Sequence, residues 1–185
     1  MEVTVVRSRR KTIAICVQED LTVTLKVPQR FPKKEIDRIL LEKEPWIQKQ
    51  REKILKRNAE FEARGITKLT DRELKALQAQ ARIHIPARVA FWAPLVGVSY
   101  NRISIRNQRT RWGSCSSEGN LNFNCLLMLA PQEVIDYVVV HELCHRKEMN
   151  HSAAFWGEVA RVLPEYKKSV KWLRDEGSLL MKRKS

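Results

Sequence analysis

Five consecutive residues in the last third of the chain have the spacing of a metal centre. The run His141-Glu142-Leu143-Cys144-His145 places two histidines four residues apart and a glutamate directly after the first. On an α-helix, residues four apart lie about 40° apart in projection and one turn along the axis, so both imidazoles can reach one ion. Glu142 lies about 100° around the helix from His141, outside the ligand set and near a metal-bound water. The pattern predicts a zinc-dependent hydrolase in which Glu142 acts as general base on that water.

A third ligand is needed if one coordination position is to stay open for water or substrate. His151 follows the second histidine by six residues, the spacing of the HExxHxxGxxH pattern. The glycine that turns the chain in that pattern is replaced by Glu148, so we expect Asn150, which tolerates left-handed φ, to make the turn. His151 is the expected ligand, and a downstream glutamate, Glu158 or Glu165, is the alternative. Zinc is the expected ion, although three-histidine sites also take Mn²⁺, Co²⁺ or Ni²⁺.

The helix that carries these residues is marked in the sequence. Pro131 is typical of a first helical turn, and apolar residues follow it at helical spacing. The fourth histidine, His84, lies far from the pair and is expected to have a surface or packing role.

The N-terminal part begins with strands. Three β-branched runs, at residues 3–6, 12–17 and 21–27, alternate apolar with polar residues and predict a small antiparallel β-meander. From Lys33 the apolar period becomes helical, with Pro45 marking a kink or a break.

Helix signals then separate two parts of the chain. Arg64-Gly65 is a helix stop, and Thr70-Asp-Arg-Glu resembles a capping box that opens a second helix, which Pro86 interrupts or bends. Strand patterns return at residues 98–107 and 120–127. This order predicts an α+β fold and one domain over residues 1–185, with an N-terminal β-meander and helical subdomain at 1–64 and a catalytic part at 65–185.

The charge of the chain favours an anionic partner. There are 35 Lys and Arg against 21 Asp and Glu, a net charge of +14. No acidic residue lies between Glu73 and Glu118, and that stretch holds seven basic residues, so half of the excess lies there. Four of the seven lie within the predicted strand at 98–107 or directly after it: Arg102, Arg106, Arg109 and Arg111. If they border the metal they would favour phosphate, because guanidinium binds phosphate oxygens bidentately; if they point away they form a solvated sheet face.

Other features exclude membrane and export classes. No apolar run approaches the 18 or more residues of a spanning helix, and the N-terminus is charged where a signal peptide is apolar. The four cysteines form no CxxC pair and predict reduced thiols and a cytoplasmic protein.

Four segments together resemble a known family. They are RWGSC at 111–115, GNLNFN at 119–124, VVHELCH at 139–145 and NHSAAFW at 150–156. They resemble the YgjP-like family of metal-dependent hydrolases, which is related to the SprT-like and WLM metallopeptidases. The resemblance implies a zincin-like metallopeptidase catalytic domain with His141, His145 and His151 as metal ligands and Glu142 as catalytic base. The family is filed as metallopeptidase by its motif, and UTP pyrophosphatase-type activity is also ascribed to it.

In zincins an edge strand beside the active-site helix lines the substrate cleft, and here it is either strand 119–126 or the RWGSC segment. The candidate substrate-binding residues are therefore Arg109, Arg111, Trp112, Asn122 and Asn124. Three functions follow: a zinc metallopeptidase with a peptide substrate, a metal-dependent nucleotide phosphohydrolase, or a basic nucleic-acid-associated zinc protein.

Overall fold

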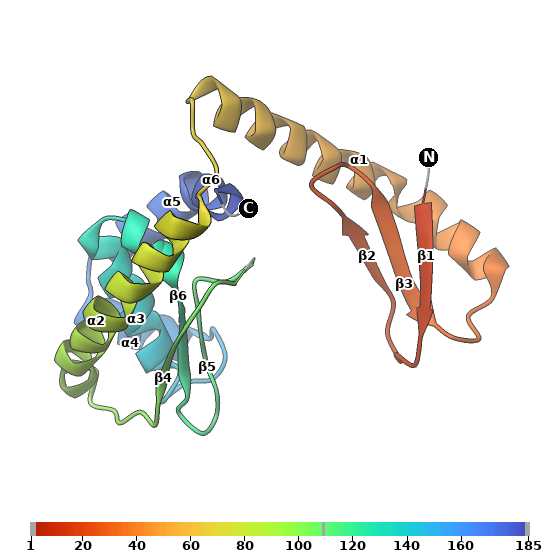
Figure 1. Ribbon diagram of the computed structural model, residues 1–185. Coiled ribbons are helices and arrows are strands. Elements are labelled where there is room, and N and C mark those ends of the chain that lie inside the picture. The colour runs from red at the N-terminus through yellow and green to blue at the C-terminus, as the bar shows by residue number, and fades with distance from the viewer. Residues whose placement is uncertain (1–2, 109, 184–185) are drawn as a thin grey trace. The chain divides into compact units, whose positions relative to one another are not determined.

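The chain divides into two compact units, residues 1–66 (unit 1) and 67–185 (unit 2). The computed structural model describes residues 3–108 and 110–183, and it is mixed α and β in both units (Figure 1). Arg109, one of the residues named above, lies outside the described residues.

Unit 1 opens with a three-stranded sheet of β1 (Val3–Ser8), β2 (Ala14–Val17) and β3 (Val23–Pro28). The strand order is β1-β3-β2, with β1 parallel and β2 antiparallel to β3. The three strands were predicted, but the antiparallel meander is wrong because the third strand lies in the centre. The alternating apolar side chains of β3 are almost fully buried, whereas those of β1 are not. The strand β3 therefore takes the central position, with a strand on each side of it.

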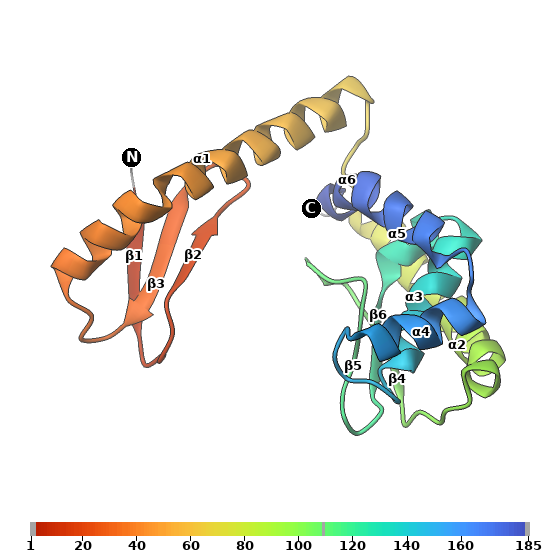
Figure 2. The same ribbon diagram turned by 180° about the vertical axis from the view of Figure 1, so that it is seen from behind.

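One long helix, α1 (Lys33–Ala63), packs its first turns against this sheet, as Figure 2 shows from behind. It runs through Pro45 as a single helix. A proline frees the carbonyl four residues earlier, which here belongs to Leu41, and at that exposed residue water can satisfy the carbonyl. The helix ends at Arg64, and Gly65 has a φ of +61°, as the predicted stop requires.

Unit 2 begins with α2 (Asp71–Val96), which opens on the predicted capping box between Thr70 and Glu73 and continues through Pro86. A second sheet follows, of β4 (Ile103–Arg106), β5 (Gly113–Cys115) and β6 (Leu121–Asn124). Its order is β4-β6-β5, with β4 parallel and β5 antiparallel to β6. The strand β6 is shorter than the predicted strand at 120–127, because Cys125–Leu129 forms a 3₁₀ helix, η1, instead.

The helix of the histidine pair, α3 (Gln132–Cys144), is the centre of unit 2. Every residue from Val134 to Val140 is buried, since α2, β5 and two later helices pack around it. The later helices are α4 (Ala153–Val162), α5 (Tyr166–Asp175) and α6 (Gly177–Lys182). A helix that is apolar on most sides is stable only when it is covered in this way.

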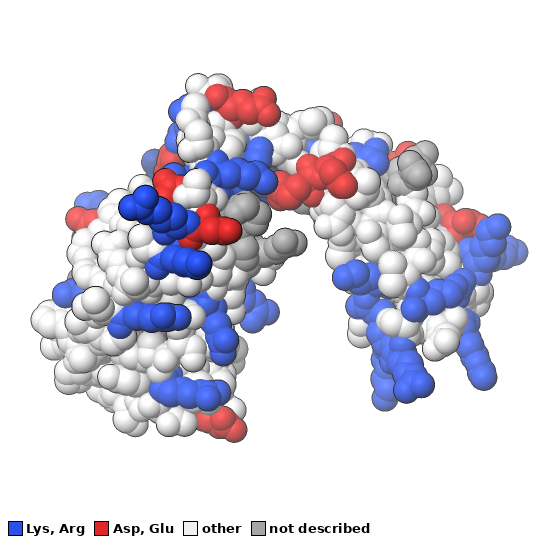
Figure 3. All heavy atoms as spheres, in the orientation of Figure 1, with Lys and Arg blue, Asp and Glu red and all other residues white. Residues whose placement is uncertain are grey.

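Lys and Arg side chains gather at the end of unit 1 where β1 and β3 finish (Figure 3). Among the described residues, no helix combines the length and the apolar character needed to cross a membrane.

A partly buried ion pair joins α2 to α3. Arg88 Nε and Nη2 donate to Asp136 Oδ1 and Oδ2 at 2.6 and 3.0 Å, and Gln132 donates to the same carboxylate at 2.9 Å. His84 Nε2 lies 2.8 Å from the Gln132 side-chain oxygen, so His84 belongs to this packing contact.

We expect Arg88→Ala to lower the free energy of unfolding by about 2 kcal/mol, because it leaves the Asp136 carboxylate, 9 % exposed, without its charged donor. Chemical denaturation measures the change. Arg82→Ala, on an exposed position of the same helix, is the control and should change stability by less than about 0.5 kcal/mol. Equal effects of the two variants would contradict the assignment.

Candidate metal centre

Three histidines meet at the end of α3. His141 and His145 come from the helix and His151 from the loop after it, and their ligand-capable nitrogen atoms all lie within 4.8 Å of one another. His151 Nε2 and His141 Nε2 are 3.0 Å apart, so the two atoms point at the same place. Three imidazole nitrogens that converge in this way are the donor set that zinc accepts, and they leave room for a fourth ligand.

Hydrogen bonds on the far side of two rings set which nitrogen faces the cluster. His145 Nδ1 lies 3.0 Å from the backbone carbonyl of Glu148, and since a carbonyl only accepts, Nδ1 carries the proton and Nε2 carries the lone pair. His141 Nδ1 lies 3.3 Å from the Tyr137 hydroxyl. Burial, followed by the neighbouring His145 and His151, lowers the pKa of His141 to about 3, so its ring is neutral as a ligand must be.

The ring of Phe155 forms the floor under all three histidines. Its centroid lies 4.9 Å from that of His141, 4.6 Å from that of His145 and 4.8 Å from that of His151, and the residue is fully buried. Trp156 extends this floor beside His151. The sequence patterns did not assign either residue to the site; the signal available was the spacing of four between His151 and Phe155.

Glu142 is buried beside the sheet rather than in the histidine cluster. It is 5 % exposed, and a Cβ built on Gly113 would lie 2.6 Å from its Oε1, so a larger residue at that position of β5 would displace the Glu142 side chain. Burial raises the pKa of Glu142 to about 8, opposed by the charge of Arg111. Glu142 therefore lies against β5 and within electrostatic reach of Arg111.

The turn between the second and third histidines differs from expectation. Among the described residues other than glycine, a positive φ occurs at Leu21 alone, so the prediction that Asn150 is left-handed is wrong. The Asn150 side chain instead accepts a hydrogen bond from the Ser152 amide at 3.0 Å, which fixes the chain just after the third histidine.

The alternative third ligands are engaged elsewhere. Glu158 pairs with Lys147 and Arg161, each at 2.9 Å, and Glu165 pairs with Lys168. Neither glutamate belongs to the cluster that the structure brings together in the described part of the chain.

Arg106 lies in β4, and Arg102 directly precedes that strand. Ile103 and Ile105 of β4 pack on the core, so Arg102 and Arg106, which alternate with them, lie on the opposite face from Gly113 and Glu142. Both are exposed. Arg111 is the member of the group whose charge reaches Glu142.

The other candidate substrate-binding residues have contacts within the protein. Trp112 packs on the core of unit 2 and close to Gly177. Asn122 donates to the Ser114 hydroxyl at 3.2 Å. Asn124 is fully buried, and its amide group donates to the carbonyls of Gln108 and Arg111. These bonds give Asn124 a role in holding the loop before β5, which sequence reasoning missed.

The structure identifies the edge strand that lies beside α3. The predicted edge was either 119–126 or the RWGSC segment, and β6 of the first segment lies in the centre of the sheet. β5 of the RWGSC segment is the edge, and it contacts α3.

The chain thus combines a mixed α+β fold with three clustered histidines that could hold a metal ion. The family model for the YgjP-like metallopeptidase domain matches residues 11–75 and 62–176, and the chain belongs to this YgjP-like family. No protein with a curated description matches the sequence.

Two solved structures are similar to part of the chain. The metallopeptidase zymogen abylysin of Pyrococcus abyssi is 21 % identical with a TM-score of 0.45, over 49 % of this chain and 93 % of that one. The metallopeptidase zymogen jannalysin of Methanocaldococcus jannaschii is 22 % identical with a TM-score of 0.44, over 50 % of this chain and 95 % of that one.

We expect Gly113→Ala to lower the rate of hydrolysis at least about a hundredfold, because the new Cβ would lie 2.6 Å from Oε1 and must displace the Glu142 carboxylate. The variant should keep its circular dichroism spectrum and its bound metal, and kcat is the measurement. The control is Gly157→Ala on α4, where nothing lies within 4 Å of the added Cβ. This control should keep full activity, and its free energy of unfolding should rise by up to about 1 kcal/mol.

We expect Phe155→Leu to weaken zinc binding about tenfold, because the floor under the three imidazoles loses its ring. Competition with a fluorescent chelator measures the affinity. Val159→Ala, a buried position one turn further along α4, should cost about 1.5 kcal/mol of stability without changing the zinc affinity. If both variants weaken zinc binding equally, the floor has no specific role.

Proposed function

We propose that the chain is a zinc-dependent peptidase in which His141, His145 and His151 hold the ion and Glu142 is the general base. The observation that carries the proposal is the convergence of three imidazole nitrogens within 4.8 Å at the end of the helix that also bears Glu142. When bound, zinc would polarise the scissile carbonyl and lower the pKa of a water molecule at the site.

The residues of the chain supply the rest of the chemistry. Glu142 accepts the proton of the attacking water and returns it to the leaving nitrogen. Its position is fixed by burial and by the contact with Gly113, so it does not compete with the histidines as a ligand. His145 is held by the Glu148 carbonyl and His141 by the Tyr137 hydroxyl, which keeps the ligand nitrogens aimed at the ion.

The edge strand supports a peptide substrate. β5 is an edge of its sheet and contacts α3, so an extended peptide that pairs with β5 would pass beside Glu142. The small side chains of β5, Gly-Ser-Cys, leave space for that approach.

The arginines give less support to a nucleotide substrate. A triphosphate needs several cationic groups around it, whereas Arg102 and Arg106 lie on the opposite face of the sheet from Glu142. Arg111, which is exposed and near Glu142, suits a single anionic group such as the carboxylate of a peptide.

The test is a panel of peptides and nucleoside triphosphates with the wild-type chain and Glu142→Gln. We expect peptide cleavage that falls by about 10² to 10⁴ in the variant, since Gln keeps the shape but accepts no proton. Chelation should abolish the cleavage and added zinc should restore it, while the variant should still bind zinc.

Two results would contradict the proposal. Phosphate or pyrophosphate release that depends on Glu142, without peptide cleavage, would assign the centre to nucleotides. Less than about half an equivalent of any divalent metal in the purified protein would remove the metal centre altogether.

A further inference from the structure

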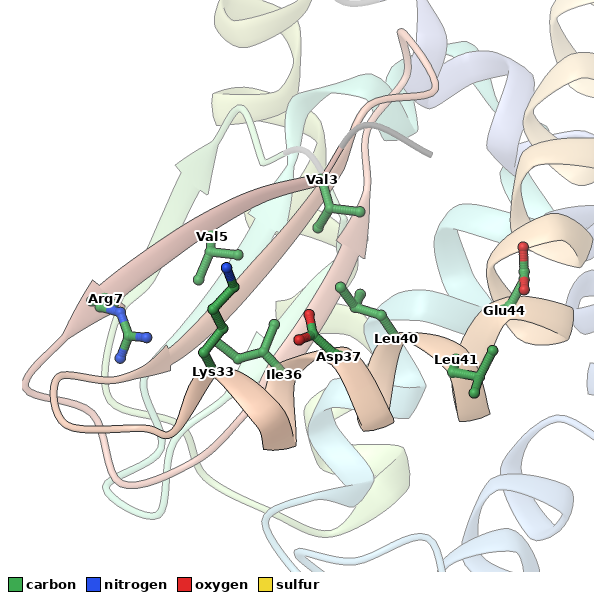
Figure 4. Close-up of a pocket in the computed structure, with 9 residues that line it drawn as sticks. All are labelled: Val3, Val5, Arg7, Lys33, Ile36, Asp37, Leu40, Leu41 and Glu44. Carbon is green, nitrogen blue, oxygen red and sulfur yellow. The ribbon is translucent and has the colours of Figure 1, made fainter.

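A groove lies within unit 1, between the strand β1 and the helix α1. Its volume is about 590 Å³, and all its lining residues belong to residues 3–44. Figure 4 shows the lining side chains of β1 on one wall and those of α1 on the other. The apolar ones are Val3, Val5, Ile36, Leu40 and Leu41. A volume of this size accommodates several side chains of a ligand.

The strand wall of the groove is an open sheet edge. The order β1-β3-β2 leaves one edge of β1 without a strand neighbour among the described residues, so alternate backbone N–H and C=O groups of its six residues face outward. The parallel register of β1 with β3 places Val5 opposite the buried Leu25, on the face that α1 covers. Val5 nevertheless stays 40 % exposed there, because the helix covers β3 and stands off from β1.

The helix wall adds exposed apolar surface. Leu41 is 73 % exposed, the largest value but one among the exposed large apolar side chains, and it faces the groove together with the partly buried Leu40. An open edge beside a helix with apolar groups between them is the arrangement that binds an extended peptide as an added strand.

Charges at the two ends of the groove restrict the occupant. Arg7 and Lys33 line one end and Glu44 the other, as Figure 4 shows, and Asp37 lies between them. Arg7 also donates to the carbonyls of Gln29 and Phe31, which holds its guanidinium at this place. The matching peptide carries an acidic group at the Arg7 end and a basic group at the Glu44 end.

We propose that this groove is a peptide-docking site, in which an extended segment of about six residues with alternating apolar side chains pairs with the free edge of β1. The acidic end of the segment lies beside Arg7 and Lys33. The site is independent of the metal centre, since every residue that lines it belongs to unit 1. The proposal goes beyond hydrolysis, because it concerns capture of a peptide without reaction.

The experiment uses the full chain carrying Glu142→Gln, so that probes are bound and not cleaved, and fluorescence anisotropy as the readout. The probes are fluorescein-labelled octapeptides of alternating Val and Thr. They carry Lys at the N-terminal and Glu at the C-terminal end, the reverse arrangement, or neither. We expect one charged arrangement to bind at least tenfold more tightly than the neutral peptide, and N-methylation of its alternate amides to abolish binding.

Neighbouring positions provide matched variants. Val5 and Val6 are 40 % and 41 % exposed and lie on opposite faces of the same strand, so Val5→Glu should weaken binding at least tenfold and Val6→Glu less than twofold. Lys33→Glu should weaken binding of the charged peptide about tenfold, whereas Lys34→Glu, an exposed position outside the lining, should not.

Several results would overturn the proposal. They are equal effects of Val5→Glu and Val6→Glu, no binding by any peptide of the panel at 1 mM, or binding of a single-stranded RNA oligonucleotide where no peptide binds. Self-association of the chain that is lost in Val5→Glu would assign the edge to a second copy instead. Because no readout here depends on turnover, failure of this proposal is distinct from failure of the proposed peptidase activity.

Discussion

The proposed metal centre needs three imidazole rings that present unprotonated nitrogens to one point, and the packing around α3 in unit 2 favours this arrangement. Nε2 of His141 and Nε2 of His151 lie 3.0 Å apart, a separation that two positively charged rings would oppose. Burial holds His141 neutral, and α3 can be buried because it is apolar on nearly every side. The helices and the sheet around α3 therefore serve the chemistry of its last turn as well as the stability of the unit.

The second constraint is the position of Glu142, the proposed base, outside the cluster of the three histidines. Glu142 follows the first histidine directly, but the helix turns it towards β5, where Gly113 gives it space. The same face of β5 carries Cys115, whose thiol pKa is raised by burial and by the charge of Glu142. In the proposed mechanism this buried carboxylate lies within reach of a chain that pairs with the edge of β5.

Local sequence patterns predicted the local features of this chain but missed the contacts between residues far apart in the sequence. The histidine helix, the capping box at Thr70 and the stop at Gly65 each depend on residues within one or two turns, and all are present. The order of the strands was not predictable in this way, because it depends on which strand is most buried in the finished sheet. The role of Phe155 was missed for a similar reason, since an apolar residue at helical spacing looks the same whether it packs on leucines or on ligands.

The two sheets have the same order, with the third strand in the centre and the first strand parallel to it, yet their edges differ in chemistry. β5 has small residues and lies beside a buried carboxylate, so a chain that pairs with it meets a reactive group. β1 has exposed valines and lies beside exposed leucine, so a chain that pairs with it meets only apolar surface and fixed charges. Because apolar contact retains a peptide without activating it, the edge of β1 is suited to capture and the edge of β5 to reaction.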